Sequence, residues 1–260
     1  MKLTPIIPDL TQFPGEFHSL LSGAPVFDSS CSPNARVWYI RREDGLYLKT
    51  APAGTLAEEA AMTACFHKYG FGAEVLSYLR ADQDWLLTRQ VPGDDCIHPK
   101  YLEDPKRLCD TVAEALRRLH SIPPDITLPS RTPQALCRAE NNWQQKQFDL
   151  SAFPDNWGYA SPEEAWHTLE SQGHLLRSDT LIHGDYCLPN ILLENWHFQG
   201  FVDLGAAGAG DRHFDLFWGI WSLGFNLKTD RYRDRFLDAY GREDVEPELL
   251  RVDAACEVFG

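Results

Sequence analysis

The order of strand-like and helix-like segments is the feature that most constrains the fold of this chain. Two segments that alternate apolar and polar residues flank an Asp44-Gly45 pair, which is typical of a hairpin turn. A segment rich in helix formers and two further strand-like segments follow. This order predicts a small β-rich N-terminal lobe. In chain order, the five segments are 35–40, 45–50, 55–70, 74–79 and 84–91.

Helical signals dominate the rest of the chain. Asp104 and Ser161 each stand as a helix N-cap directly before a proline, and Glu164 completes a capping box with Ser161. Two more helix-like segments close the sequence. We therefore expect an α+β protein of two lobes, a small β-rich lobe over 1–91 and a larger, mainly helical lobe over 92–260.

Composition limits the compartment and the partners. The 260 residues include 24 Lys and Arg against 38 Asp and Glu, so the net charge is −14. This charge disfavours nucleic acid and anionic membranes and favours a cationic ligand, although an acidic chain can also indicate solubility alone. The sequence has no membrane-length apolar run and no signal-peptide pattern, which predicts a cytoplasmic protein. Seven cysteines without a CxxC pair indicate reduced thiols.

The segment from His183 to Gly205 carries the strongest chemical signal. Asp185 precedes Asn190 by five residues, the spacing of a kinase catalytic loop, in which the aspartate orients the attacking hydroxyl and the asparagine holds magnesium. Asp203 then ends an apolar strand, where a kinase places its second magnesium ligand. Each residue alone could serve a turn, but two motifs in this order favour phosphoryl transfer.

The N-terminal lobe offers matching phosphate ligands. Lys49 closes the second strand and precedes a helix with Glu58 and Glu59, as required for a lysine that contacts phosphates and pairs with a helix glutamate. Tyr47 lies on the same strand face as Lys49. A Gly-rich phosphate loop is missing, and the serine-rich segment 29–37 stands in its place. Its hydroxyl and N–H groups suit a phosphate, and they equally suit an ordinary loop.

These motifs together resemble the aminoglycoside 3'-phosphotransferase family, in the motifs HGDYCLPN, GFVDLG, DRHFDL, SCSPNARVW and LYLKT and in the ending CEVF. The resemblance extends from about Ser30 to Phe259. It implies a protein-kinase-like two-lobed fold and ATP-dependent phosphorylation of an aminoglycoside hydroxyl, the 3'-hydroxyl, which confers resistance to the antibiotic.

The resemblance also implies roles for individual residues, with ATP and Mg²⁺ as cofactors. Asp185 matches the catalytic aspartate. The other matches are Asn190 and Asp203 as magnesium ligands, Lys49 with Glu59 as the phosphate-binding ion pair, Tyr47 stacking on adenine, Ser32 near the β-phosphate, and the backbone of Arg89 and Val91 at the adenine edge.

For the substrate, the resemblance implies a small cationic aminosugar held by acidic groups. Its expected contacts are Asp155, Glu257, Phe259 and the terminal Gly260. Three positions depart from the family pattern: Ala206, where a basic residue is usual, and Trp221 and Phe225, where relatives have polar or acidic residues.

Two other functions remain as alternatives at this point. One is a kinase of the same fold that acts on another small metabolite. The other is an inactive nucleotide-binding regulator, which the presence of Lys49, Asp185, Asn190 and Asp203 disfavours. In each case we expect a monomer or weak dimer without nucleic-acid or membrane partners.

Overall fold

The computed structural model describes residues 3–149 and 158–260, and contacts divide the chain into two units. The first unit comprises the described residues up to Asp95 together with 192–205, and the second comprises 96–191 and 206–260. The first unit is rich in strands and the second is larger and mainly helical, so the expected α+β class is confirmed. The lobe boundary after residue 91 stays a prediction. Within the described residues, no helix has the length and apolarity needed to cross a lipid bilayer.

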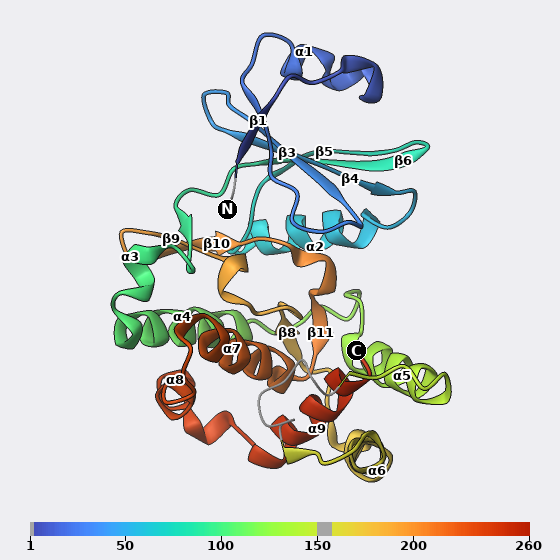
Figure 1. Ribbon diagram of the computed structural model, residues 1–260, viewed down its shortest axis with the longest axis vertical. Helices are drawn as coiled ribbons and strands as arrows, with labels where there is room; N and C mark the ends of the chain where they lie inside the picture. Colours follow the sequence, from blue (N-terminus) through green and yellow to red (C-terminus); the bar gives the residue numbers. More distant parts are fainter. Residues whose placement is uncertain (1–2, 150–157) are drawn as a thin grey trace. The chain divides into compact units, whose positions relative to one another are not determined.

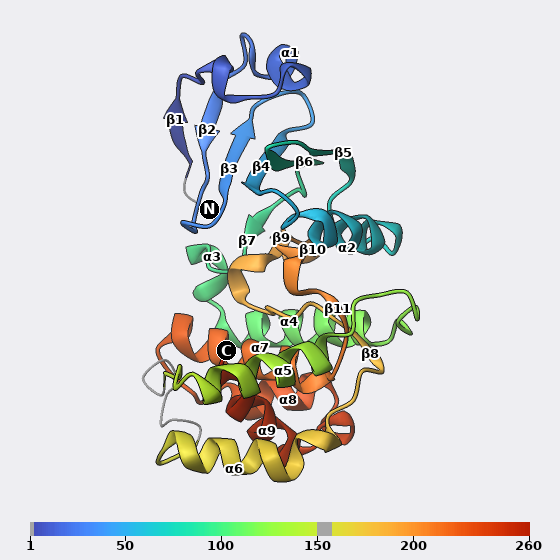
Figure 2. The ribbon, with the colours of Figure 1, turned by 90° about the vertical axis from the view of Figure 1, so that its right-hand side faces the viewer.

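The first unit is built on one antiparallel six-stranded sheet, in the order β1-β2-β3-β4-β6-β5 (Figure 1 and, turned by 90°, Figure 2). The predicted hairpin is present: Ile40 pairs with Leu46, and Gly45 has a φ of +61°, which favours glycine. The strands are β1 (Thr4–Ile6), β2 (Val26–Asp28), β3 (Arg36–Ile40), β4 (Leu46–Pro52), β5 (Val75–Arg80) and β6 (Gln83–Arg89).

The N-terminal additions to this sheet were not predicted. The strands β1 and β2 have three residues each, too few to show an alternating pattern, and three short helices lie between them. Phe13 packs edge-on against Trp38, which stacks on Trp85 at 6.0 Å. The added segment therefore covers one face of the sheet. The short helices are η1 (Leu10–Gln12), η2 (Gly15–Phe17) and α1 (His18–Leu21).

The helix α2 (Ala57–Lys68) and a later chain segment complete the first unit. The buried Asp84 at the start of β6 accepts the Leu56 N–H at 2.9 Å, which fixes the beginning of α2. Phe201 stacks on Phe71 and so holds the chain just before Asp203. The later segment pairs with β7 to form a three-stranded sheet in the order β10-β9-β7. Its elements are β7 (Asp94–Asp95), β9 (Ile191–Glu194), β10 (His197–Phe201) and η6 (Leu204–Ala206).

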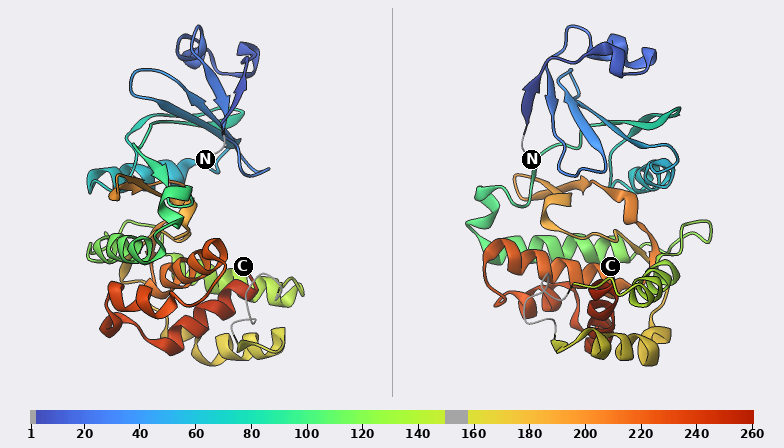
Figure 3. Two further views of the ribbon diagram at one scale, coloured as in Figure 1. Left: turned by 60° about the vertical axis from the view of Figure 1, so that its left-hand side comes forward. Right: turned by 45° about the vertical axis from the view of Figure 1, so that its right-hand side comes forward.

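The second unit is a helical assembly around α7, which packs against α4, α8 and α9; the further views show the orange α7 beside the green α4 (Figure 3). The predicted caps are present, since Asp104 accepts the Arg107 N–H and Ser161 accepts the Glu164 N–H. The elements are α3 (Pro99–Leu102), α4 (Pro105–His120), α5 (Arg131–Gln144), α6 (Pro162–Gln172), η4 (Gly173–Leu175), β8 (Thr180–Ile182), η5 (Leu188–Asn190), β11 (Gly208–Gly210), α7 (Arg212–Leu227), α8 (Arg233–Tyr240), η7 (Arg242–Asp244) and α9 (Pro247–Val258).

Candidate active site

Lys49 lies at the centre of an ion-pair network in the first unit. Its Nζ is 2.8 Å from both carboxylate oxygens of Glu59 and 3.1 Å from Oδ1 of Asp203. Burial alone would lower the pKa of Lys49, but the two carboxylates outweigh it and raise the pKa above its ordinary value. The lysine therefore stays charged. Burial raises the pKa of Glu59, and the contact with Lys49 opposes this shift.

Asp203 is held in an unusual conformation. Its φ of +59° lies in the left-handed region, which most residues with a side chain avoid. Its side chain is 57% exposed although one oxygen contacts Lys49. A strained, exposed carboxylate beside a buried cation is suited to bind a ligand rather than to stabilise the fold.

The adenine contacts expected from the resemblance lie at one end of the neighbouring strands β4 and β6, where Tyr47 pairs with Thr88 and Leu46 pairs with Arg89. Tyr47 alternates with the buried residues of β4 and so shares a face with Lys49. Burial raises the pKa of Tyr47 to about 12, so the ring stays neutral. The Arg89 N–H donates to the Glu74 carbonyl at 2.9 Å, which fixes the backbone at the end of β6. Val91 is buried directly after this strand.

Ser32 lies in the exposed turn between β2 and β3. Its Oγ accepts the Asn34 N–H at 3.1 Å, and the hydroxyl hydrogen can still donate to a phosphate oxygen. The turn takes the place of the missing Gly-rich loop.

Asp185 and Asn190 contact each other directly in the second unit. The Asn190 Nδ2 donates to the backbone oxygen of Asp185 at 3.0 Å and to its Oδ2 at 2.9 Å. Because both contacts use the amide nitrogen, Oδ1 of Asn190 is directed elsewhere and can bind a cation. The pair therefore combines a fixed carboxylate with an oxygen ligand of the type magnesium prefers.

The start of this loop depends on Asp215, whose role the DRHFDL motif does not predict. Its two carboxylate oxygens accept the backbone N–H groups of His183 and Gly184, each at 2.7 Å. Gly184 has a φ of +81°, and a Cβ there would lie 2.2 Å from the Ala206 carbonyl oxygen. Only glycine fits this close approach. His183 is fully buried, in keeping with a structural role.

Glu257 is the predicted substrate residue that the structure links most directly to Asp185. Its side chain is 10% exposed and lies 3.9 Å from the Arg138 guanidinium. Burial raises the pKa of Glu257; Arg138 and a hydrogen bond from Trp218 oppose the shift, and the Asp185 charge adds to it. The two carboxylates are thus within electrostatic reach of each other.

The remaining predicted substrate contacts are Phe259, Gly260 and Asp155, and they differ in whether a ligand could reach them. The ring of Phe259 is buried against Trp143 and Trp166, so it anchors the chain and offers no face to a ligand. Gly260 is exposed and its N–H donates to the Glu257 carbonyl. Asp155 lies outside the described residues.

An open groove of about 520 Å³ follows one face of α5 and was not predicted. It meets the Glu257 region through two of its own residues: Arg138 pairs with Glu257, and the Asn142 amide donates to the Phe259 carbonyl at 2.6 Å. The groove is lined by Pro133, Gln134, Cys137, Arg138, Asn141 and Asn142.

Two of the positions that depart from the family pattern form an aromatic row on α7. Trp218 packs edge-on against Trp221, which stacks on Phe225 at 5.0 Å. Phe225 is 55% exposed, and Lys228 Nζ lies 4.2 Å from its ring centre. Ala206, the third such position, ends the short helix η6.

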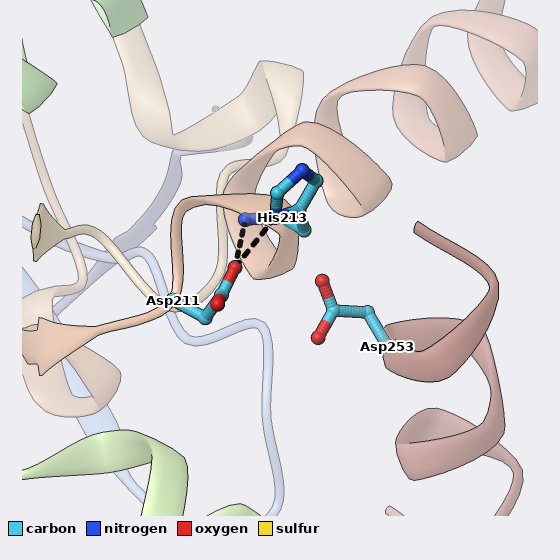
Figure 4. Close-up of side chains that lie close together, drawn as sticks. All are labelled: Asp211, His213 and Asp253. Atoms are coloured by element: carbon cyan, nitrogen blue, oxygen red, sulfur yellow. Dashed lines mark hydrogen bonds and ion pairs between the residues drawn. The ribbon is translucent and has the colours of Figure 1, made fainter. Parts of the chain in front are cut away.

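A separate buried cluster joins Asp211, His213 and Asp253, and Figure 4 shows the Asp253 carboxylate directed toward the other two. Its composition suggests a metal site, but the hydrogen bonds oppose this. His213 Nδ1 contacts Asp211 at 2.6 Å, and its Nε2 accepts the Glu246 N–H at 2.9 Å. Because both ring nitrogens are engaged, the histidine has no lone pair for a metal.

Asp253 is therefore a buried carboxyl group without a hydrogen-bond partner among the described residues. Burial, the largest cause, and the charge of Asp211 raise its pKa well above the ordinary value. In contrast, hydrogen bonds from His213 and Arg177 overcome the effect of burial and lower the pKa of Asp211. The cluster thus holds one ionised and one protonated carboxyl group.

This difference predicts a pH-dependent effect of Asp253→Asn on stability. Between the ordinary aspartate pKa and the raised pKa of Asp253, the folded wild type binds more protons than the unfolded chain, so its stability falls as pH rises. The variant lacks this slope. We expect its melting temperature to exceed that of the wild type by several degrees at pH 8, since about 1 kcal/mol corresponds to 2–4 °C at this size, and the gap to close toward pH 4. A gap that is constant with pH would contradict the assignment.

The comparisons with known proteins fit this arrangement. The model of the phosphotransferase enzyme family matches residues 34–253. A probable aminoglycoside 3'-phosphotransferase of Lactococcus lactis is 46% identical over 254 residues, 97% of each chain. The streptomycin 3''-kinase of Streptomyces griseus is 33% identical over 195 residues, 69% of this chain and 70% of the kinase.

Solved structures have the same fold. An aminoglycoside-3'-phosphotransferase of type VIII superposes with a TM-score of 0.75 at 22% identity and 96% coverage of each chain. An aminoglycoside phosphotransferase of Streptomyces rimosus in complex with ADP and streptomycin superposes with a TM-score of 0.70 at 22% identity, over 97% of this chain and all of the other.

Proposed function

Since the chain belongs to the phosphotransferase enzyme family, we propose that it transfers the γ-phosphoryl group of ATP to the 3'-hydroxyl of an aminoglycoside antibiotic and so confers resistance. The contact between Asp185 and Asn190 is the observation that supports this reaction type, because phosphoryl transfer needs a carboxylate and a magnesium ligand close together. The relative that is 46% identical along almost the whole chain supports the substrate class.

On the acceptor side, Asp185 orients and activates the substrate hydroxyl. Its carboxylate accepts the hydroxyl proton while the oxygen forms its bond to phosphorus and the bond to the leaving ADP breaks. The Asn190 amide fixes one carboxylate oxygen, and Asp215 fixes the backbone before it, so the base needs little reorganisation during the reaction.

On the nucleotide side, the donor set of this chain fits ATP and Mg²⁺. Bound ATP supplies the phosphoryl group, and Mg²⁺ neutralises its charge. Lys49 is charged and held by Glu59, so it can contact phosphate oxygens at little entropic cost. The exposed oxygen of Asp203 and Oδ1 of Asn190 are hard ligands suited to magnesium. Tyr47, Ser32 and the backbone of Arg89 and Val91 hold the rest of the nucleotide.

On the substrate side, Glu257 binds an ammonium group of the antibiotic. A buried ammonium needs a carboxylate partner because desolvation of an unpaired charge costs several kcal/mol. Asp155 adds a second carboxylate to this substrate site, and the buried Phe259 fixes the chain that carries Glu257. The net charge of −14 favours the approach of a polycation.

Glu257→Gln tests this binding role. We expect the KM for kanamycin to rise about 10-fold or more, with little change in the KM for ATP, because the variant removes one carboxylate from a desolvated ion pair. The loss should shrink as salt screens the attraction. Steady-state kinetics at two ionic strengths measure both effects.

Glu246→Gln is the matched control, since Glu246 forms an exposed ion pair with Arg177 at 3.0 Å. It changes the net charge by the same amount outside the proposed site. Equal, salt-independent changes in both KM values for Glu257→Gln would remove Glu257 from the substrate site.

The function itself is tested with purified protein, ATP, Mg²⁺ and kanamycin, and by growth of a sensitive bacterium on the drug. We expect a monophosphorylated product carrying its phosphate on the 3'-oxygen, and resistance that is lost with Asp185→Ala. A 3'-deoxy aminoglycoside should not be phosphorylated. Phosphorylation of the 3'-deoxy compound would show that another hydroxyl is the acceptor. Absence of any product would refute the proposal.

The aromatic row on α7, of which Phe225 is the exposed member, favours a second candidate substrate. Trp221 and Phe225 suit the apolar face of a ring better than they suit an ammonium group that needs a carboxylate. A less cationic metabolite with an alcohol group would fit this surface. Competition between kanamycin and neutral sugars in the same assay separates the two classes.

A further inference from the structure

The loop that carries Asp185 and Asn190 is held by α7 at two places. Asp215 binds the backbone at the start of the loop, as described above. Ser222 lies seven residues later, two helical turns along the same face, and contacts the loop between its two functional residues. Its Oγ accepts the Leu188 N–H at 2.9 Å.

Ser222 is itself fixed in place. It is 1% exposed, and Asn226 Nδ2, one turn further along α7, donates to its carbonyl oxygen at 2.8 Å and to its Oγ at 3.3 Å. With two N–H groups directed at Oγ, the hydroxyl hydrogen is left to donate.

The backbone of Cys187 connects the residue held by Ser222 to both functional residues of the loop. Its N–H donates to the Asp185 carbonyl at 2.8 Å, and its carbonyl accepts the Asn190 N–H at 2.9 Å. Because Cys187 directly precedes Leu188, a shift of the Leu188 backbone is passed on to Asp185 and Asn190.

We propose that Ser222 is a positioning residue for the reaction, whose hydroxyl fixes the backbone of Leu188 and thereby sets the placement of Asp185 relative to Asn190. The proposal rests on the proposed function. A buried N–H that loses its acceptor must move or find another partner, and the loop has functional residues on both sides of Leu188. Displacement of a catalytic group by about 1 Å is enough to reduce turnover strongly.

Ser222→Ala is the direct test. We expect kcat to fall about 10-fold or more, while the KM values for ATP and kanamycin change less than about twofold, because the variant displaces the base and touches neither ligand. Ser222→Thr retains the hydroxyl and should recover most of the activity. Amide hydrogen exchange at Leu188 should become faster in Ser222→Ala.

Ser171→Ala is the matched control. Its hydroxyl donates to the His167 carbonyl at 2.7 Å on the exposed side of α6, so its loss removes a helix hydrogen bond of similar length without touching the loop. We expect unchanged kcat. Should Ser222→Ala not fold, Asn226→Ala replaces it, with a smaller fall in kcat and unchanged KM values.

The outcomes separate this proposal from the proposed function. A wild type that phosphorylates kanamycin together with an unaltered kcat in Ser222→Ala overturns the positioning role alone, as does an equal rise in both KM values. A wild type without phosphotransferase activity overturns the proposed function. In that case, unchanged exchange at Leu188 in the variant still overturns the contact on which the positioning role depends.

Discussion

Asp185→Asn should lower kcat at least about 10²-fold and leave ATP binding near normal. The side chain acts on the acceptor hydroxyl, and the amide that replaces it cannot take a proton. In the wild type, the Asn190 Nδ2 donates to Asp185 Oδ2 at 2.9 Å. The amide oxygen of the variant can accept the same hydrogen bond, so the substitution removes the base and largely keeps the geometry of the loop.

Steady-state kinetics together with calorimetric titration of ATP and Mg²⁺ measure this effect. Asp179→Asn is the matched control, since Asp179 is exposed just before β8 and its carboxylate contacts only the neighbouring Thr180 among the interactions described. Its kcat should stay at the wild-type value. Turnover of Asp185→Asn within a few-fold of the wild type, in a preparation free of contaminating kinase, would contradict the role of Asp185.

The sequence predicts correctly those parts of the molecule that are specified by residues close together in the chain. The hairpin at Gly45 and the caps at Asp104 and Ser161 are specified by residues within a few positions of each other, and all three are present. The motif residues Asp185 and Asn190 could be predicted because their spacing of five residues is itself a signal in the sequence, and the two side chains are in contact in the structure.

Other features depend on contacts between distant segments, and no local pattern signals them. Asp215 and Ser222 bind the backbone of a loop about 31 and 34 residues earlier in the chain. The ion pair between Arg138 on α5 and Glu257 on α9 likewise joins residues far apart in the sequence. The local pattern also does not distinguish Glu59 from Glu58 as the partner of Lys49. In the structure, the orientation of α2 directs Glu59 to Lys49.

The environment of the buried polar groups in the second unit is also set by distant segments and could not be predicted from local patterns. Asp253 looks like an ordinary helix carboxylate in the sequence, yet it lies wholly inside the protein against Asp211 and His213. Whether such a group is a metal ligand or a protonated acid depends on whether His213 has a free ring nitrogen. Its Nε2 is occupied by the backbone N–H of Glu246, 33 residues away. Residue identity alone does not determine that outcome.

A second large effect is expected at Asp203. We expect Asp203→Ala to abolish the magnesium-dependent part of ATP binding, with affinity falling about 10²-fold or more in the presence of Mg²⁺, because a lost carboxylate ligand leaves the triphosphate charge uncompensated. Without Mg²⁺, affinity should change little. Lys49 keeps its contacts with Glu59 in the variant, so the phosphate-binding cation stays in place.

The backbone at Asp203 requires a second variant, because alanine tolerates a φ of +59° less well than aspartate does. Asparagine tolerates this conformation and has nearly the same shape, so Asp203→Asn removes the charge without the strain. We expect both variants to lose magnesium-dependent binding, whereas Asp82→Ala, at an exposed turn of the same unit, should bind ATP like the wild type. If Asp203→Asn retained full affinity for ATP with Mg²⁺ while Asp203→Ala lost it, the residue would serve the backbone rather than the metal, and the magnesium role of Asp203 would be wrong.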